Sequence, residues 1–418
     1  MIESTVDARG DATTARRWQP VLAGTPAARA MAVVDEIARA IAPLLLDERA
    51  GADLANGASG GALLFRELEQ IGRRGPRSPT ARGLVDEAWS RCRRLPLSGS
   101  LWSGTTGVAY AAAQVAARPP SPVLIAQLTD AVRRLPSGEY DLIAGAIGGG
   151  VLALELLPDS RAAELLEAVV AHLAATAQRR DGGLAWATSH PTIPASWRYD
   201  LGVAHGVPGV VALLAGALAS PSPPRGTAEL LTGAVRWTLA QRLSGAARSC
   251  FPRGVGGPAP GPARLAWCYG DAGIAVALLL AARALADDRL HRVAHDVARK
   301  AATRSFESSG VVDAGVCHGA AGVAHMFGRM LQFTADESCA AAARYWLDRT
   351  LALRRLALPA GRTAGTTAVD GDGPAGPRPD AEPGLLVGGA GVGLVLLAAC
   401  SEQDPRWDRA LLASHPFL

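Results

Sequence analysis

The residues best suited to chemistry in this sequence are Cys268, Cys317 and His318. Cys268 stands two residues before Gly270, and the pair Cys317-His318 stands directly before Gly319. Both glycines begin the same motif, Gly-x-x-Gly, which is followed by an apolar run of small residues. Two thiolates and one imidazole can bind a zinc ion and leave its fourth position open, as is usual at catalytic zinc sites. The sequence therefore predicts one Zn²⁺ ion, bound by these three side chains.

A single buried cysteine can also be a small residue of the core that binds no metal. Two cysteines and a histidine at matching places in two repeats are better explained by a metal. Their spacing fits no zinc finger, which disfavours a purely structural site. The remaining cysteines have no such surroundings and are predicted to be core or surface thiols: Cys92, Cys250, Cys339 and Cys400.

The three ligands also limit the kinds of reaction that the site could catalyse. Two anionic thiolates reduce the positive charge at zinc, so such an ion is a weaker Lewis acid than one bound by three histidines. It favours binding a further thiol as a thiolate, which requires lowering a pKa of about 8.5. Alkylation or addition of a thiol is therefore a better prediction than hydrolysis by zinc hydroxide.

The Gly-x-x-Gly motif occurs seven times, and an apolar segment follows each copy. Successive copies begin 47, 41, 61, 64, 49 and 69 residues apart, which indicates a repeat architecture rather than a string of unrelated domains. The segments after the glycines are apolar almost all round, as expected of helices that are buried on every side. The copies begin at Gly57, Gly104, Gly145, Gly206, Gly270, Gly319 and Gly388.

A second kind of helix, amphipathic at helical spacing, precedes the motif in each repeat, which makes about seven outer and seven inner helices. We predict such outer helices at Arg29–Leu46, Val123–Leu135, Arg161–Gln178, Ala228–Leu243, Asp288–Arg304 and Glu337–Leu353. This alternation favours an all-α fold, an α/α toroid with inner helices standing inside a ring of outer ones. An open solenoid, the alternative, would show a more constant period and polar end repeats. We assign residues 28–418 to the toroid and residues 1–27 to a polar, flexible segment.

The motifs are predicted to lie together at one mouth of the toroid. The residue directly before each motif then belongs to a ring of seven, of which five are polar: Asn56, Ser103, Ala144, His205, Tyr269, His318 and Val387. Burying polar residues is costly unless they are paired, so function is the simpler explanation for a buried polar ring. Three long segments rich in Gly and Pro lead to this mouth and are predicted to wall a substrate groove: residues 180–204, 244–263 and 359–383.

His205 is the candidate general acid or base, because the unperturbed pKa of histidine is close to neutrality. The alternative is a core histidine with satisfied hydrogen bonds. Asp141 belongs to the neighbouring repeat and is predicted to orient the imidazole. Arg264, four residues before Cys268, is predicted to stabilise a developing oxyanion, with a surface arginine as the alternative.

Together these motifs resemble the lanthionine synthetase C family, the lantibiotic cyclases. The resemblance extends from about Asn56 to Leu397 and rests on Trp267-Cys268-Tyr269-Gly270, Cys317-His318-Gly319, Ala204-His205-Gly206 and Asp141. It implies an α/α toroid with zinc bound by the residues matching Cys268, Cys317 and His318. It also implies acid or base roles for His205 and Asp141, and it places Arg264 and Tyr269 in the wall of the site.

The resemblance also supplies a substrate, a dehydrated precursor peptide. Its cysteine thiols would bind zinc and add to dehydroalanine or dehydrobutyrine, forming the lanthionine and methyllanthionine rings of a lanthipeptide antibiotic. His205 would protonate the enolate carbon, and Arg264 would stabilise the enolate oxygen. Because no dehydratase region precedes the motifs, we expect a stand-alone cyclase, with a separate dehydratase and an exporter as further partners.

Two other functions remain open at this point. One is a glutathione- or peptide-binding protein of the same family without cyclase turnover. The other is a zinc prenyltransferase, which the low aromatic content of 5% disfavours because an isoprenoid pocket would need aromatic walls.

Composition excludes several further classes. The net charge is only +4 and the basic residues are scattered, so nothing supports nucleic-acid binding. Six cysteines at irregular, distant positions do not form a disulfide framework, which favours a reducing cytoplasm. The N-terminus is polar and unlike a signal peptide. The two longest apolar stretches are too short or too rich in glycine for a transmembrane helix, so buried helices are predicted there.

Overall fold

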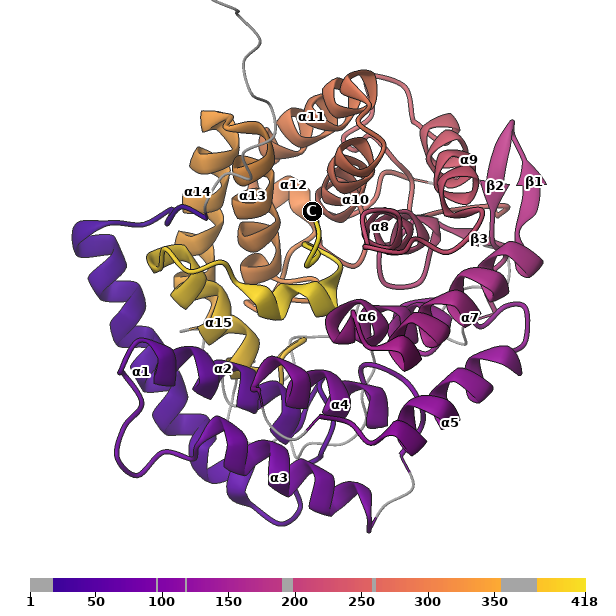
Figure 1. Cartoon of the computed structure of the whole chain (residues 1–418). Coiled ribbons are helices and arrows are strands. Elements are labelled where there is room, and N and C mark those ends of the chain that lie inside the picture. Colours follow the sequence, from indigo (N-terminus) through magenta and orange to yellow (C-terminus); the bar gives the residue numbers. More distant parts are fainter. Residues whose placement is uncertain (1–17, 95–96, 117–118, 190–197, 258–260, 355–381) are drawn as a thin grey trace, which may run out of the picture.

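The computed structural model describes residues 18–94, 97–116, 119–189, 198–257, 261–354 and 382–418. Within them, fourteen helices of at least ten residues alternate between two concentric rings (Figure 1). The inner helices are α2 (Ala58–Gln70), α4 (Thr105–Gln114), α6 (Ala146–Leu156), α8 (Val207–Leu218), α10 (Asp271–Ala284), α13 (Ala320–Thr334) and α15 (Gly389–Cys400). The outer helices are α1 (Gly24–Leu46), α3 (Ala81–Cys92), α5 (Pro122–Arg133), α7 (Ser160–Thr176), α9 (Thr227–Ala240), α11 (Asp288–Ala302) and α14 (Glu337–Leu353).

The two rings follow from the two kinds of apolar pattern. Helices α8 and α15 bury every residue except the last, as all-round apolar sequences must. Helix α11 buries only one face, at Leu290, Ala294, Val297, Ala298 and Ala301, and exposes charged residues on the other. Every motif predicted to begin an inner helix does so, and α3 is the seventh of the predicted outer helices, the one whose bounds had not been predicted.

The inner ring is closed. Each inner helix contacts the next one along the chain, from α2 through α13 to α15, and α15 returns to contact α2. Helix α1, the first of the chain, covers the outside of α15, the last inner helix. The prediction of an α/α toroid is therefore confirmed, and the open solenoid is wrong.

The glycine motifs let the loops before the inner helices fold back at one mouth of the ring. The second glycine of each copy lies against the carbonyl six residues earlier: a Cβ atom at Gly322 would come within 1.8 Å of Val316 O, and one at Gly107 within 2.0 Å of Leu101 O. A chain of backbone hydrogen bonds then joins all seven loops. The bonds run from Ala55 N to Trp102 O, Leu385 N to Ala55 O, Cys317 N to Leu386 O, Cys268 N to Cys317 O, Ala204 N to Cys268 O and Leu142 N to Ala204 O.

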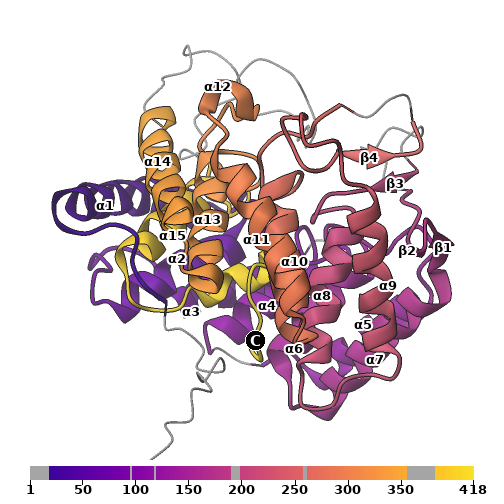
Figure 2. The ribbon, with the colours of Figure 1, turned by 90° about the horizontal axis from the view of Figure 1, so that it is seen from above.

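Short strands lie among the long segments between helices. Strands β1 (Gln178–Arg180) and β2 (Gly183–Ala185) form a hairpin, and β3 (Tyr199–Asp200) pairs antiparallel with β4 (Gly254–Val255). Two of the three predicted walls of the mouth therefore pair with each other, whereas most of the third, residues 359–383, lies outside the described residues. The short helix α12 (Phe306–Ser309) lies at the same end as β3 and β4, and the C-terminus lies towards the other end (Figure 2).

The described chain packs against the toroid from its first residues. Residues 1–17 lie outside the described part of the chain, but Trp18 is buried and its indole nitrogen donates to Ala398 O at 3.0 Å. Helix α1 then begins at Gly24, and the division of the chain at residue 27 stays a prediction. Over the described residues, every helix is too short or too polar to cross a bilayer.

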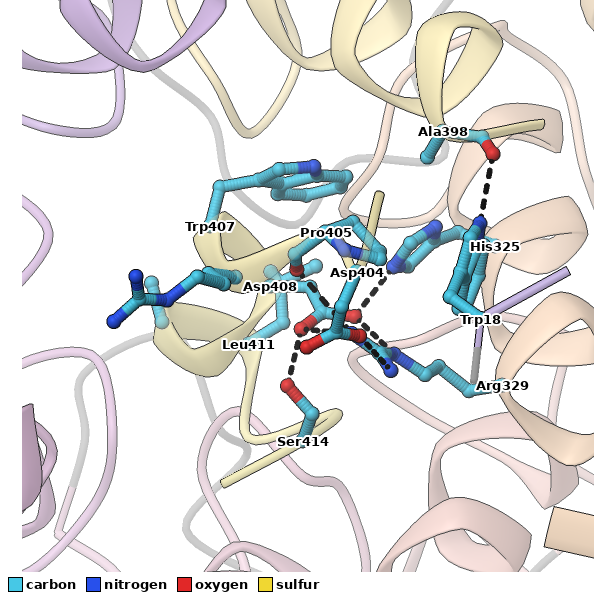
Figure 3. Close-up of polar contacts among 12 residues, drawn as sticks. Trp18, His325, Arg329, Ala398, Asp404, Pro405, Trp407, Asp408, Leu411 and Ser414 are labelled. Carbon is cyan, nitrogen blue, oxygen red and sulfur yellow. Dashed lines mark hydrogen bonds and ion pairs between the residues drawn. The ribbon is translucent and has the colours of Figure 1, made fainter. Parts of the chain in front are cut away.

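The C-terminal segment crosses the end of the toroid opposite the mouth (Figure 1), and its 3₁₀ helix η2 (Arg406–Leu411) carries Asp408, whose polar contacts are drawn in Figure 3. Asp408 is fully buried there and accepts hydrogen bonds from His325 Nε2 at 2.7 Å, Arg329 Nε at 2.6 Å and Ser414 Oγ at 2.6 Å. Burial alone would raise the pKa of Asp408, but the charge of Arg329 and the hydrogen bond from His325 outweigh burial and lower it. The indole of Trp18 stacks on His325 and lies under the Arg329 guanidinium.

Breaking this network is expected to destabilise the toroid. Asp408→Asn should lower the free energy of unfolding by about 3–5 kcal/mol, because the charge of Arg329 would remain buried with less compensation. Urea denaturation followed by circular dichroism measures the change. Arg133→Ala, which removes an exposed ion pair to Asp130, should change the free energy by less than about 1 kcal/mol. Equal stability of the two variants would contradict this account of the C-terminal closure.

Candidate metal centre and acid–base pair

The structure brings Cys268, Cys317 and His318 together at the mouth. One potential ligand atom of each residue lies within 4.8 Å of the other two. Backbone pairing accounts for this, since Cys268 N donates to Cys317 O at 3.2 Å and so aligns two neighbouring loops. Both cysteines are buried, whereas the His318 side chain is 22% exposed.

These three side chains fit a tetrahedral zinc ion. Bonds of about 2.0–2.3 Å at tetrahedral angles place ligand atoms roughly 3.3–3.8 Å apart, so a small inward movement of the side chains is enough. Asp313 Oδ2 lies 3.4 Å from His318 Nε2, and a carboxylate in this place commonly orients a metal-binding imidazole. Among the described residues, this is the one cluster of three or more His, Cys, Asp or Glu side chains with such geometry.

The surroundings favour an anionic sulfur at Cys268. The hydrogen bond from Cys317 is the largest influence, and together with His318 and the charge of Arg264 it outweighs burial and lowers the pKa of Cys268 to about 5. Burial opposes protonation of His318, but the hydrogen bond and charge of Cys268 outweigh it and raise the pKa of the imidazole. A thiolate paired with an imidazolium is the state from which a metal ion would displace a proton.

This difference in pKa gives a chemical test of the cluster. In metal-stripped protein at about pH 6.5, iodoacetamide should alkylate Cys268 ahead of the isolated cysteines, because the thiolate is the nucleophile. Burial raises the pKa of those isolated thiols: Cys92, Cys250, Cys339 and Cys400. Peptide mass mapping would locate the label, and added zinc should suppress it. Labelling that spreads evenly, or that zinc leaves unchanged, would argue against a metal centre at Cys268.

His205 and Asp141 form a buried pair close to this cluster. Asp141 Oδ2 lies 2.6 Å from His205 Nδ1, and the side chains are only 6% and 3% exposed. The other oxygen of Asp141 accepts from Ala144 N at 2.8 Å and Gly145 N at 2.9 Å, so the start of α6 fixes the carboxylate. The predicted contact between the two repeats is therefore present in the structure. Because Asp141 holds Nδ1, proton transfer by His205 would take place at Nε2.

The backbone of His205 is also held in place. Tyr140, directly before Asp141, donates its buried hydroxyl to His205 O at 3.2 Å and shares it with Trp186 O at 3.1 Å. Tyr140 was not among the site residues predicted from the sequence, although its position beside Asp141 offered a signal.

Tyr269 and Arg264 occupy different parts of the mouth. Tyr269 is buried, with its ring centre 6.3 Å from that of His205. Arg264 is half-buried and lies near enough to Cys268 for its charge to lower the pKa of that thiol. Its carbonyl would lie 2.0 Å from a Cβ atom at Gly270, whose φ of +97° also favours glycine. The structure thus places Arg264 on the side of the cysteines.

The expectation of a buried polar ring was wrong. Of the seven positions before the motifs, only His205 and Tyr269 are buried and His318 is half-buried; the exposed ones are Asn56, Ser103, Ala144 and Val387. In those four repeats this position is exposed to solvent. The chemistry-bearing side chains therefore gather on one side of the mouth, contributed by four consecutive repeats, from that of Asp141 to that of Cys317.

Two residues that sequence analysis missed also contact this region. Asp200 is fully buried and interacts with the Tyr269 hydroxyl, and the Arg253 guanidinium lies over the Tyr269 ring. Asp200 stands six residues before Gly206, as Asp313 does before Gly319, and this shared spacing was a signal in the sequence.

Comparisons with known proteins agree with this architecture. The family model described as lanthionine synthetase C-like protein matches residues 48–412. Nisin cyclase has a similar structure, with a TM-score of 0.68 over 92% of this chain and 98% of the nisin cyclase chain, at 18% sequence identity. A sugar epimerase from a ruminal bacterium gives a TM-score of 0.41 at 9% identity, over 77% of this chain and 86% of that chain. Among curated proteins, none matches this sequence.

The match to the family model spans most of the chain and includes all seven glycine motifs. The similarity to nisin cyclase shows a shared fold over nearly the whole length of both chains. This chain belongs to the lanthionine synthetase C-like family.

Proposed function

We propose that this protein is a zinc-dependent cyclase that forms lanthionine and methyllanthionine rings in a dehydrated precursor peptide. The observation that carries the proposal is the grouping of Cys268, Cys317 and His318 within 4.8 Å, beside a buried histidine–aspartate pair. One part of this arrangement suits thiol chemistry and the other suits proton transfer. Ring formation by addition of a thiol to a dehydrated residue needs both.

Cys268, Cys317 and His318 would hold the zinc ion. When bound, zinc would supply a position at which a substrate thiol is stabilised as a thiolate, with its pKa lowered from about 8.5. The two cysteine sulfurs contribute negative charge, which keeps such a thiolate nucleophilic.

The remaining side chains would handle the proton and the developing charge. In the addition, a C–S bond forms at the β-carbon, the C=C double bond becomes a single bond, and the α-carbon takes up one proton. His205 would deliver that proton from Nε2, because Asp141 holds Nδ1 at 2.6 Å. Arg264 would stabilise negative charge on the enolate oxygen. The thiol proton released earlier balances the one consumed.

The partners follow from this reaction. The substrate is a peptide that a dehydratase has already converted, and an exporter would carry the cyclised product out of the cytoplasm, where we place the protein. These assignments rest on the proposed chemistry and on the family.

The proposal is tested with the full-length protein loaded with zinc and a peptide that contains one cysteine and one dehydroalanine. Free thiols should disappear with enzyme-dependent kinetics, and the mass of the peptide should stay the same because addition is an isomerisation. A matched peptide with alanine in place of dehydroalanine should keep its thiol. Tight peptide or glutathione binding without loss of thiol would instead indicate a binding protein of the same fold.

A further inference from the structure

Asp200 and Arg253 flank Tyr269, beside the candidate acid–base pair. The Arg253 guanidinium carbon lies 4.5 Å from the centre of the Tyr269 ring, in cation–π geometry. The Asp200 carboxylate interacts with the Tyr269 hydroxyl and with the charges of His205 and Arg253. Asp200 is fully buried, and a buried carboxylate is costly unless polar partners compensate it. The partners here are therefore the reason that this position tolerates a carboxylate.

The backbone fixes Asp200 and Arg253 relative to each other. Strand β3 pairs with β4, with Asp200 opposite Gly254, and Leu201 N donates to Arg253 O at 2.9 Å. Gly202 N donates to Asp200 Oδ1 at 2.6 Å, which sets the direction of the carboxylate. The pairing of these two long connecting segments therefore places the Asp200 carboxylate and the Arg253 guanidinium beside Tyr269.

The Tyr269 ring also lies against Gly202, which has no side chain. Gly202 and Tyr269 form an isolated antiparallel bridge, and a Cβ atom on Gly202 would come within 2.8 Å of the ring atoms Cδ1 and Cε1. The ring is therefore restrained by Gly202, by the cation of Arg253 and through its hydroxyl by Asp200. Its centre lies 6.3 Å from the imidazole centre of His205.

The electrostatics agree with this geometry. Burial raises the pKa of Asp200 to about 7, and the Gly202 amide, the charges of His205 and Arg253, and the Tyr269 hydroxyl limit the rise. Asp200 Oδ1 accepts from the Gly202 amide, whereas Oδ2 is buried without a hydrogen bond of standard geometry.

We infer that Asp200 and Arg253 are positioning residues that hold the ring and hydroxyl of Tyr269 beside His205 for the cyclisation reaction. The inference rests on the proposed function for its kinetic consequences. Neither residue touches the reacting atoms. Asp141 already occupies Nδ1 of His205, so Asp200 and Arg253 act on the site through Tyr269.

Asp200→Asn is expected to lower kcat for cyclisation about tenfold, with zinc content unchanged and KM changed less than about twofold. Asp53→Asn is the matched control, because Asp53 lies in the corresponding loop of the first repeat and accepts from Asn56 N at 2.8 Å. Its kcat should equal that of the wild type. If Asp200→Asn fails to fold, Arg253→Met carries the test, since the half-buried Arg253 side chain is easier to replace.

A double-mutant cycle separates positioning from general stability. In a Tyr269→Phe background, Asp200→Asn should lower kcat less than twofold, because the hydroxyl through which it acts is gone. An equal loss of kcat in both backgrounds, or no loss in the single variant, would overturn the inference.

A second measurement does not depend on activity. The chain has five tyrosines, so ring signals in ¹³C-tyrosine spectra can be assigned to Tyr269 with the Tyr269→Phe variant. Asp200→Asn and Arg253→Met should both shift the Tyr269 ring signals, and Asp53→Asn should not. Unshifted signals would overturn the inference even if the enzyme cyclises peptides. Shifted signals in a protein without cyclase activity would instead overturn the proposed function alone.

Discussion

Cys317→Ala is expected to reduce bound zinc to less than about one-tenth of an ion per chain and to abolish cyclisation. Two remaining ligands, Cys268 and His318, would bind zinc far more weakly than three, because ligation supplies most of the binding free energy. The rate should fall at least about a thousandfold, which corresponds to roughly 4 kcal/mol of transition-state stabilisation. Metal analysis of the purified variant and loss of peptide thiols over time measure the two effects.

Cys339→Ala is the matched control for this substitution. Cys339 is buried like Cys317 but lies in the outer helix α14 and belongs to no group of three potential metal ligands among the described residues. The Cys339→Ala variant should bind one zinc ion and cyclise peptide at the rate of the wild type. Full activity of Cys317→Ala without bound zinc would refute the role proposed for the three side chains.

His205→Asn is expected to lower kcat by about 10²–10⁴ while one zinc ion stays bound. Its imidazole is the proposed proton donor, and a positioned acid contributes a factor of this size. Asp141→Asn should cause a loss of at least about a hundredfold, because an amide in place of the carboxylate would favour the wrong imidazole tautomer. The double variant should be little slower than His205→Asn alone, since the two residues act as one unit.

Metal analysis and kcat, measured on the same preparations, check this second prediction. His295→Asn provides a control, because His295 pairs with Asp336 near the surface, on the outer helix α11. Its kcat should be unchanged. Loss of zinc from His205→Asn would mean that the imidazole is a ligand rather than an acid or base.

Much of the fold could be predicted because the Gly-x-x-Gly motif marks where each inner helix begins. Segments that are apolar all round also indicate helices that are buried on every side. The bounds of α3, the seventh outer helix, were not predicted because its buried stripe contains Arg91, which is only 4% exposed. The Arg91 guanidinium donates to Leu45 O and Asp47 O at the end of α1 at 3.1 Å. A charge inside the stripe interrupts the apolar pattern by which amphipathic helices are recognised. Arg91 is therefore buried because it contacts the end of α1, and the sequence of α3 alone does not show that contact.

The candidate site also has one part that could be predicted from the sequence and another that could not. Cys268, Cys317 and His205 stand at matching places in repeats, so the sequence could bring them to one mouth. The neighbours of Tyr269 depend instead on the pairing of β3 with β4, two short strands in segments far apart along the chain. No local pattern in either segment indicates that pairing, so the placement of Asp200 and Arg253 beside Tyr269 is known only from the structure, although the spacing of Asp200 before Gly206 was visible in the sequence.

The central claim is that three side chains hold a metal ion whose remaining position accepts a substrate thiol. Absorption spectra of protein loaded with Co²⁺ in place of zinc test it most directly, since thiolate ligands give intense charge-transfer bands. We predict two cysteine thiolates on the metal before peptide is added and a third after addition of a cysteine-containing peptide. A peptide with serine in place of cysteine should leave the spectrum unchanged. A spectrum that the cysteine peptide does not alter would contradict the account.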